Sequence, residues 1–250
     1  MLYAYGATAY QGEAMSRAAR PAPGRRVEPG SSVTARELDT VTDGTGAGGA
    51  GGPGGPGGRG GAGGSGGSGG SGGRVAVPDA GRLVHLQFRR FAGCPVCNLH
   101  LRSVVRRHDE ITAAGVREVV VFHSPAGELL EHVAGLPFAV VADPEKRLYA
   151  EFGVESAPRA LLHPRAWAPV TRAVLRSTWT LLRRQERAPS SRPHGGRLGL
   201  PADFLIAPDG RVLAAKYGEH AYDQWPVDEL LALAARATGG GAVSGGGDHA

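Results

Sequence analysis

Cysteine and long apolar segments are both scarce in this chain. Only two of its 250 residues are cysteine, so a fold held together by several disulfides is excluded. The two lie three positions apart, and a bridge across so short a loop would stabilise the fold very little. No apolar run approaches the ~20 residues of a membrane-spanning helix, and no apolar stretch follows the arginines of residues 1–26 as it would in a secretory signal. We therefore expect a cytoplasmic protein without a transmembrane segment.

Glycine, by contrast, is abundant and concentrated. Of the 30 residues from 44 to 73, 20 are glycine, and such a tract cannot bury apolar surface, so we expect a flexible coil there. Short strand patterns flank it at Ser32–Thr42 and Arg74–Asp79. The tract either enlarges the tip of a β-hairpin, which costs little loop-closure entropy, or ends a plain tail before a domain that begins at Arg74. The expected organisation is a disordered tail (1–30), one domain (31–238) with insertions at 44–73 and 155–198, and a glycine-rich tail (239–250).

Both cysteines fall where a strand would meet a helix. Val84–Phe88 is typical of a strand, Gly93 of a turn, and Cys94 and Cys97 would lie in the first turn of an amphipathic helix. The unpaired N–H groups and the dipole of a helix start stabilise a thiolate, which lowers a cysteine pKa from ~8.5 toward ~7. Pro95 fits there because the first helical turn does not need its missing N–H. Strand, turn, C-x-x-C and helix together indicate a thiol redox site.

Two alternatives predict less chemistry. The cysteines could be ordinary buried residues, but these would not need the proline between them or the turn before them. They could also bind zinc with His100 as a third ligand, but the sequence offers no second C-x-x-C or H-x-x-x-H to complete the site. We expect no metal and, in the absence of haem, flavin or nicotinamide motifs, no cofactor.

The remaining pattern alternates strands and helices, which predicts an α/β fold with a parallel or mixed sheet. Pro208-Asp209-Gly210 is typical of a tight turn between antiparallel strands, and Gly115 is expected to end the helix that begins at the cysteines. Strands are expected at 117–124, 138–142, 199–207 and 211–217, and helices after Cys97, Ser124, Asp143 and Pro226.

This order of elements resembles the thioredoxin fold, and within it the peroxiredoxin-like branch of the alkyl hydroperoxide reductase/thiol-specific antioxidant (AhpC/TSA) family. The motifs that carry the resemblance are the C-x-x-C after a strand, Leu148-Tyr149 with Phe152-Gly153-Val154, and Gly199-Leu200-Pro201 before the Pro-Asp-Gly hairpin. The resemblance implies a central mixed β-sheet flanked by helices, with a helical insertion. It also implies an enzyme that reduces peroxides or disulfides and draws electrons from a thioredoxin-like protein or a low-molecular-weight thiol.

The resemblance assigns roles to particular residues. Cys94, the N-terminal and more exposed sulfur, would attack, and Cys97 would resolve; a peroxiredoxin-type alignment would reverse these roles. The family's Thr or Ser three residues before the attacking cysteine is missing, and its arginine beside the thiolate has only Arg197 near the expected position. Thioredoxins place a cis-proline opposite the cysteines, and Pro201 matches it best because a strand follows; Pro158 is the rival. Gly93, Pro95 and Pro201 are thus the expected supporting residues.

The segment 159–198 is unusually basic, with nine arginines and one acidic residue, in a chain whose net charge is only +5. Its pattern predicts an amphipathic helix from Pro169 to Arg187. The basic face is either simply solvated while the apolar face packs on the sheet, or recognises an acidic protein or membrane surface. No nucleic-acid-binding motif accompanies the charge. The alternative to an enzyme is a redox sensor or adaptor, in which oxidation of the C-x-x-C controls partner binding through this segment.

Overall fold

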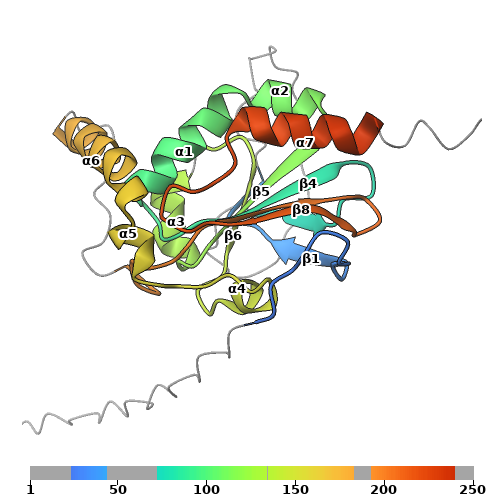
Figure 1. Ribbon diagram of the computed structural model, residues 1–250, viewed down its shortest axis with the longest axis horizontal. Helices are drawn as coiled ribbons and strands as arrows, with labels where there is room; N and C mark the ends of the chain where they lie inside the picture. The colour runs from blue at the N-terminus through green and yellow to red at the C-terminus, as the bar shows by residue number, and fades with distance from the viewer. Residues whose placement is uncertain (1–23, 44–71, 134, 183–192, 240–250) are drawn as a thin grey trace, which may run out of the picture.

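A six-stranded mixed sheet lies at the centre of the molecule (Figure 1). The computed structural model describes residues 24–43, 72–133, 135–182 and 193–239. In sheet order the strands are β2 (Thr42–Asp43), β6 (Ala139–Ala142), β5 (Val116–Phe122), β4 (Leu83–Phe88), β7 (Ala202–Ile206) and β8 (Val212–Tyr217). The three strands β4, β5 and β6 are parallel, while β2, β7 and β8 pair antiparallel with their neighbours. The α/β fold class expected from the sequence is confirmed.

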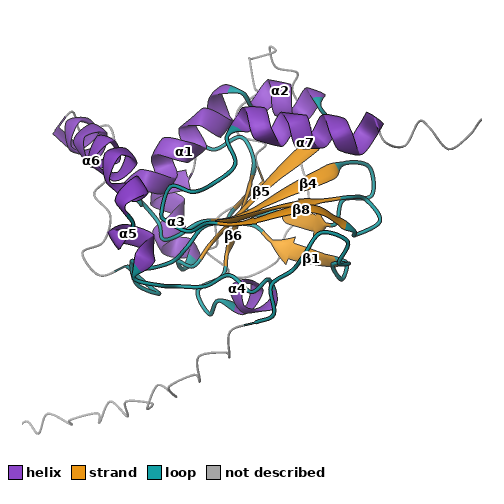
Figure 2. Cartoon of the chain, viewed as in Figure 1, coloured by secondary structure: helices purple, strands orange, loops and turns teal. Residues whose placement is uncertain are grey.

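Helices cover both faces of this sheet (Figure 2). They are α1 (Pro95–Arg106), α2 (His108–Ala113), α3 (Ala126–Val133), α4 (Arg147–Glu151), α5 (Arg159–Leu162), α6 (Trp167–Leu182) and α7 (Val227–Gly239), with a 3₁₀ turn at Pro164–Ala166. Apolar side chains of α1, α2, α3 and α7 form one core with the sheet, and α4 forms a second core on the opposite face. Because both faces are covered, β5 is buried over nearly its whole length, as its continuous apolar sequence predicts.

The strands that flank the glycine tract pair with each other. β1 (Arg36–Asp39) and β3 (Arg74–Val77) form an antiparallel ribbon in which Arg36 lies opposite Val77. This pairing agrees with the hairpin interpretation rather than with a plain tail. Residues 44–71 of the tract, residues 1–23 and residues 240–250 lie outside the described residues, so the proposed domain boundaries stay predictions.

Two local details differ from the expectation or refine it. The helix expected to run unbroken to Gly115 is interrupted at Arg107, whose backbone (φ −119°) leaves the helical region and ends α1. Arg107 forms ion pairs with Glu110 on α2 and with Asp228 on α7, which favours a break at this position. The predicted basic helix is present as α6, whose described part ends at Leu182. No helix within the described ranges is long and apolar enough to cross a membrane.

Candidate active site

The two cysteines lie at the start of α1, just after the turn that connects it to β4. Cys94 is the N-cap residue of α1, and its Sγ accepts a hydrogen bond from the backbone N–H of Cys97 at 3.5 Å. Pro95 occupies the first helical position, where no N–H is needed. Both cysteines are free thiols. The strand, turn and helix start inferred from the sequence therefore bring the two cysteines together in one turn.

Gly93 lies in the turn between β4 and α1, directly before Cys94. Its φ of +69° lies in the left-handed region that glycine tolerates best. A Cβ atom there would also lie 2.7 Å from Cε1 of His132, the imidazole that α3 places over this turn. The preceding residue, Ala92, donates its backbone N–H to Ser124 Oγ at 2.9 Å. The positive φ therefore favours glycine at this position, and a Cβ atom there would also displace the ring of the half-buried His132.

A buried arginine, which the sequence reasoning missed, lies beside the first cysteine. Arg90 Nη1 lies 3.8 Å from Cys94 Sγ, and the other terminal nitrogen, Nη2, donates to the backbone carbonyl of Arg197. Arg90 is only 3% exposed. Arg197, the arginine expected from the family pattern, places its guanidinium 5.7 Å from the centre of the Phe91 ring, and its carbonyl holds Arg90. The sequence feature that could have identified this arginine is the Arg89-Arg90 pair, which lies between the strand and the cysteines.

These contacts separate the two thiols electrostatically. Burial alone would raise the pKa of Cys94, but the hydrogen bond from the Cys97 side chain, the charge of Arg90 and backbone N–H groups lower it to about 6. Burial and the adjacent Cys94 sulfur raise the pKa of Cys97 well above its ordinary value. At neutral pH the site therefore holds one thiolate, Cys94, beside one protonated thiol, Cys97.

The expectation that Cys94 is the more exposed sulfur is wrong, because both cysteines are 1% exposed. Phe91 and Ala92 of the same turn are also buried and belong to the same core cluster as the cysteines. Exposure therefore does not distinguish the two cysteines, whereas their charge environment does.

Pro201 precedes β7, as expected, but its peptide bond is trans. The only cis peptide bond in the described ranges is Val77–Pro78. Leu200 N–H donates to Glu155 at 3.0 Å and the carbonyl of Pro201 accepts from Gly218 at 2.9 Å, so an extended trans path satisfies the backbone on both sides. The rival Pro158 is trans as well and leads into α5 rather than a strand. The prediction that a strand follows Pro201 is correct, and the prediction of a cis-proline is wrong.

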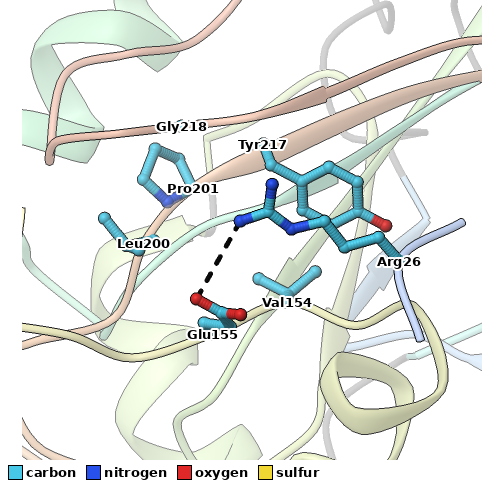
Figure 3. A pocket seen from close by; sticks show the side chains of 7 residues that line it. All are labelled: Arg26, Val154, Glu155, Leu200, Pro201, Tyr217 and Gly218. Atoms are coloured by element: carbon cyan, nitrogen blue, oxygen red, sulfur yellow. Dashed lines mark ion pairs between the residues drawn. The ribbon is translucent and has the colours of Figure 1, made fainter. Parts of the chain in front are cut away.

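Pro201 instead borders a shallow pocket that does not contain the cysteines (Figure 3). Arg26 crosses this pocket, with its guanidinium 4.8 Å from the centre of the Tyr217 ring and 4.0 Å from Glu155. The pairing of Ala202 with Phe88 puts Pro201 at the same edge of the sheet as the end of β4, from which the cysteine turn departs. The pocket and the thiols therefore share an edge of the sheet but not a cavity.

A second feature missed from the sequence is a network of ionisable groups buried in the sheet. His85 Nδ1 lies 2.9 Å from Glu118 Oε2, and its Nε2 lies 3.3 Å from Asp203 Oδ1. Arg89 donates to Asp203 at 2.7 Å and to Gln87. Burial opposes the charge on His85, but the two carboxylates raise its pKa to about 9. Because Arg89 directly precedes Arg90, the Arg89–Asp203 ion pair fixes the chain at the point where Arg90 turns toward Cys94.

A metal site at the cysteines, one of the alternatives considered from the sequence, can be checked against the structure. Within the part of the chain that the structure describes, no group of three or more His, Cys, Asp or Glu side chains is arranged to hold a metal ion. His100, considered above as a third ligand, is buried on α1, with its ring 6.5 Å from that of Tyr222. Burial and the charge of Arg89 lower the pKa of His100 to about 3, so it is neutral at physiological pH.

Comparison with known proteins supports the family resemblance. Residues 103–220 match the family model described as AhpC/TSA antioxidant enzyme. Over this segment the chain is similar to the AhpC/TSA family, and its fold is thioredoxin-like. The expectation of a peroxiredoxin-like thiol oxidoreductase is thereby confirmed. The match begins six residues after Cys97, so the roles of the two cysteines depend on the geometry described above. No curated protein sequence gives a significant match.

Solved structures share the fold at low sequence identity. The reduced 2-Cys peroxiredoxin of Plasmodium vivax superposes with a TM-score of 0.55 at 11% identity, covering 87% of this chain and 85% of its own. For Mycobacterium bovis AhpC the TM-score is 0.54 at 13% identity, with coverage of 90% and 99%. The peroxidoxin BcpB of Mycobacterium tuberculosis gives 0.51 at 15% identity, with coverage of 85% and 98%. At such identities these structures establish the fold of the domain.

Proposed function

We propose that this protein reduces peroxides through a dithiol/disulfide cycle of Cys94 and Cys97. The Cys94 thiolate attacks one oxygen of the peroxide, the O–O bond breaks, and the distal oxygen leaves as an alkoxide that takes a proton to give an alcohol or water. Cys94 becomes a sulfenic acid. The Cys97 thiol then attacks that sulfur and displaces water, which leaves a Cys94–Cys97 disulfide. Two electrons from an external thiol, of the thioredoxin or low-molecular-weight class, restore the dithiol.

One observation carries the choice of Cys94 as the nucleophile. Its sulfur accepts the Cys97 N–H and lies 3.8 Å from the Arg90 guanidinium, so the charged form is stabilised where the attack begins. Cys97 keeps its proton until the sulfenic acid has formed, since its pKa is raised. Deprotonation of Cys97 becomes easier once the neighbouring negative charge is gone. The pKa order thus matches the order of the two chemical steps.

The same arginine could stabilise the transition state of the first step. As the O–O bond breaks, negative charge develops on the leaving oxygen, and a buried guanidinium donor stabilises such charge more strongly than an exposed one. We assign supporting roles to three residues. Gly93 shapes the turn before Cys94, Pro95 starts helix α1, and Pro201 precedes β7 at the end of the sheet where β4 also ends. Because both sulfurs are 1% exposed, substrate access requires movement of the side chains that cover them.

Trapping of the intermediate tests the assignment directly. Cys97→Ser should accumulate a Cys94 sulfenic acid after one equivalent of hydrogen peroxide, detectable by mass spectrometry as a dimedone adduct. Cys94→Ser should give no adduct and no turnover, whereas the unmodified protein should give an intramolecular disulfide. A dimedone adduct on Cys97 in Cys94→Ser, formed at the rate of the parent reaction, would reverse the roles.

Turnover separates the enzyme from the sensor or adaptor alternative. With excess dithiol, an enzyme consumes many equivalents of peroxide per protein, while a sensor is oxidised once and stops. A parallel assay with hydrogen peroxide, an alkyl hydroperoxide and the disulfides of insulin identifies the substrate class. Faster turnover of insulin than of either peroxide would make the protein a disulfide reductase that uses the same two sulfurs.

A further inference from the structure

Helix α6 exposes apolar side chains that a packed amphipathic helix would bury. Only part of its apolar residues face the protein: Ala173 is buried, and Val170 packs against the same core cluster. Three large apolar residues of α6 are exposed to solvent, by 65% for Trp167, 67% for Leu175 and 57% for Trp179. The expectation that the apolar face packs on the sheet while the basic face is solvated is therefore wrong for these residues.

The exposed apolar residues lie on one side of the helix. At 100° per residue, Leu175 and Trp179, which are four residues apart and adjacent on the surface, lie 80° and 120° around the axis from Trp167. Val174, 49% exposed, adjoins them. We call these four residues the α6 stripe. Large apolar side chains gathered in this way, rather than scattered singly, mark an interaction surface.

Positive charge runs along one edge of the α6 stripe. Arg172 and Arg176 are exposed, and the helical period of 100° per residue places them between the stripe and the buried face. Helix α6 lies against α1, where partial burial and the charges of Arg176 and Arg106 lower the pKa of Arg102. Arg102, Arg106 and Arg176 are therefore close enough to act on one another electrostatically, and no acidic residue occurs in the sequence between Glu155 and Glu186.

We infer that α6 docks on a membrane surface that contains anionic lipids. Tryptophan and leucine on one face of a helix with arginines beside them are the composition of helices that lie in the membrane interface, where indole rings reach the acyl boundary and guanidinium groups meet phosphates. A second copy of the chain docked on this face would bring the α6 arginines of the two copies together, and this repulsion of like charges disfavours that occupant. In Figure 1, α6 projects from the body of the molecule, so a flat bilayer could reach it. The inference is independent of the cysteine chemistry.

The tryptophans provide a direct readout. Trp167 and Trp179 are exposed, whereas Trp225 is buried at 4%, so changes in fluorescence on binding report the α6 stripe. With large vesicles in which a third of the phosphatidylcholine is replaced by phosphatidylglycerol, the full chain should co-sediment, show blue-shifted emission and lose acrylamide quenching. With pure phosphatidylcholine vesicles the protein should show none of these three changes, and high salt should release it from the anionic vesicles.

Two variants with matched controls decide the role of the surface. Arg172→Gln/Arg176→Gln should weaken binding to the anionic vesicles about 25-fold, since each basic residue near such a surface contributes about fivefold. Leu175→Ser should weaken it as well, while Leu130→Ser, at a 37% exposed leucine on α3, should not. Arg236→Gln on α7 controls for a general loss of charge, and Cys94→Ser should bind like the parent protein, which separates this test from that of the redox cycle.

Three results would overturn the inference. The first is the absence of binding to anionic vesicles at low salt by a protein with a normal melting temperature. The second is binding that the arginine and leucine variants leave unchanged. The third is a dimer by sedimentation, or a complex with an acidic protein, that Leu175→Ser dissolves while vesicle binding is absent; the α6 stripe would then be a protein interface.

Discussion

Replacement of Arg90 by methionine should convert Cys94 from a thiolate to a thiol at neutral pH. Methionine keeps the apolar stem of the arginine but removes the charged guanidinium group, whose Nη1 lies 3.8 Å from the sulfur. At that distance an effective dielectric constant of about 20 gives an attraction of about 4 kcal/mol, equivalent to a change of about 3 in pKa. The hydrogen bonds from Cys97 remain and offset part of the loss. We therefore expect the pKa of Cys94 to rise from about 6 to about 8 or above.

The consequence for reactivity follows from the thiolate fraction. With a pKa of about 6, about nine-tenths of Cys94 is ionised at pH 7, whereas a pKa of about 8 leaves less than one-tenth. The rate of alkylation by iodoacetamide at pH 7 should fall about tenfold and recover above pH 8. Peroxide reduction should fall by more than tenfold, because the arginine would also be missing at the leaving oxygen.

Arg197→Met is the matched control. The contact of Arg197 with Arg90 is made by its backbone carbonyl, which the substitution keeps, so the pH profile of alkylation should move little. Thermal unfolding of both variants checks that neither loses its fold. A pH profile of Arg90→Met that coincides with that of the parent protein would refute the electrostatic argument and, with it, the assignment of Cys94 as nucleophile.

Three further outcomes follow from the same structure. Gly93→Ala should cost about 1–2 kcal/mol through its positive φ alone, and more through the clash with His132; urea denaturation measures it, and full stability with full activity would contradict the proposed turn. Asp203→Ala should cost about 3–5 kcal/mol, because it leaves Arg89 buried without its ion pair; an unchanged denaturation midpoint would show that this charge is solvated. Burial, followed by the charges of Arg89 and Lys146, lowers the pKa values of His100 and His123 to about 3 and about 4, so the unfolded chain binds protons on them below pH 6.5 while the folded chain does not. Stability should therefore fall by about 1.4 kcal/mol per pH unit for each histidine between pH 6.5 and 4, and His100→Phe should reduce the slope; a parallel dependence in both proteins would count against the assignment.

The elements that the sequence predicts well are those with strong local signals. The β7–β8 hairpin follows from Pro208-Asp209-Gly210, where Gly210 has the positive φ (+85°) that the turn requires. The helix start at Cys94 follows from the proline and the cysteine spacing. In both places the chemistry of two or three adjacent residues determines the backbone, so neighbouring positions carry the information.

The features that the sequence could not provide depend on residues far apart in the chain. Arg90 reaches Cys94 only because the carbonyl of Arg197 and the ion pair between Arg89 and Asp203 hold the chain from strands and loops more than a hundred residues away. In the sequence, the polar residues of the buried network on β4 look like the usual alternation of polar and apolar residues in a strand. Their partners Glu118 and Asp203 lie on the neighbouring strands β5 and β7, so the sequence does not show that they interact. The trans geometry of Pro201 likewise depends on hydrogen bonds to distant segments.

The orientation of helix α6 on the domain is another feature that the sequence alone does not predict. Its sequence is amphipathic, and a 3.6-residue period identifies the helix but does not say which of its faces meets the protein. In the structure the small residue Ala173 takes the buried position, since a small side chain lets α6 approach α1 closely, while Trp167, Leu175 and Trp179 remain outside. A helix that contacts its domain through alanine and valine but exposes its largest apolar residues beside arginines is suited to a surface that is both apolar and negatively charged. The position of the basic segment could be read from the sequence, but the orientation that gives it a partner comes only from the packing.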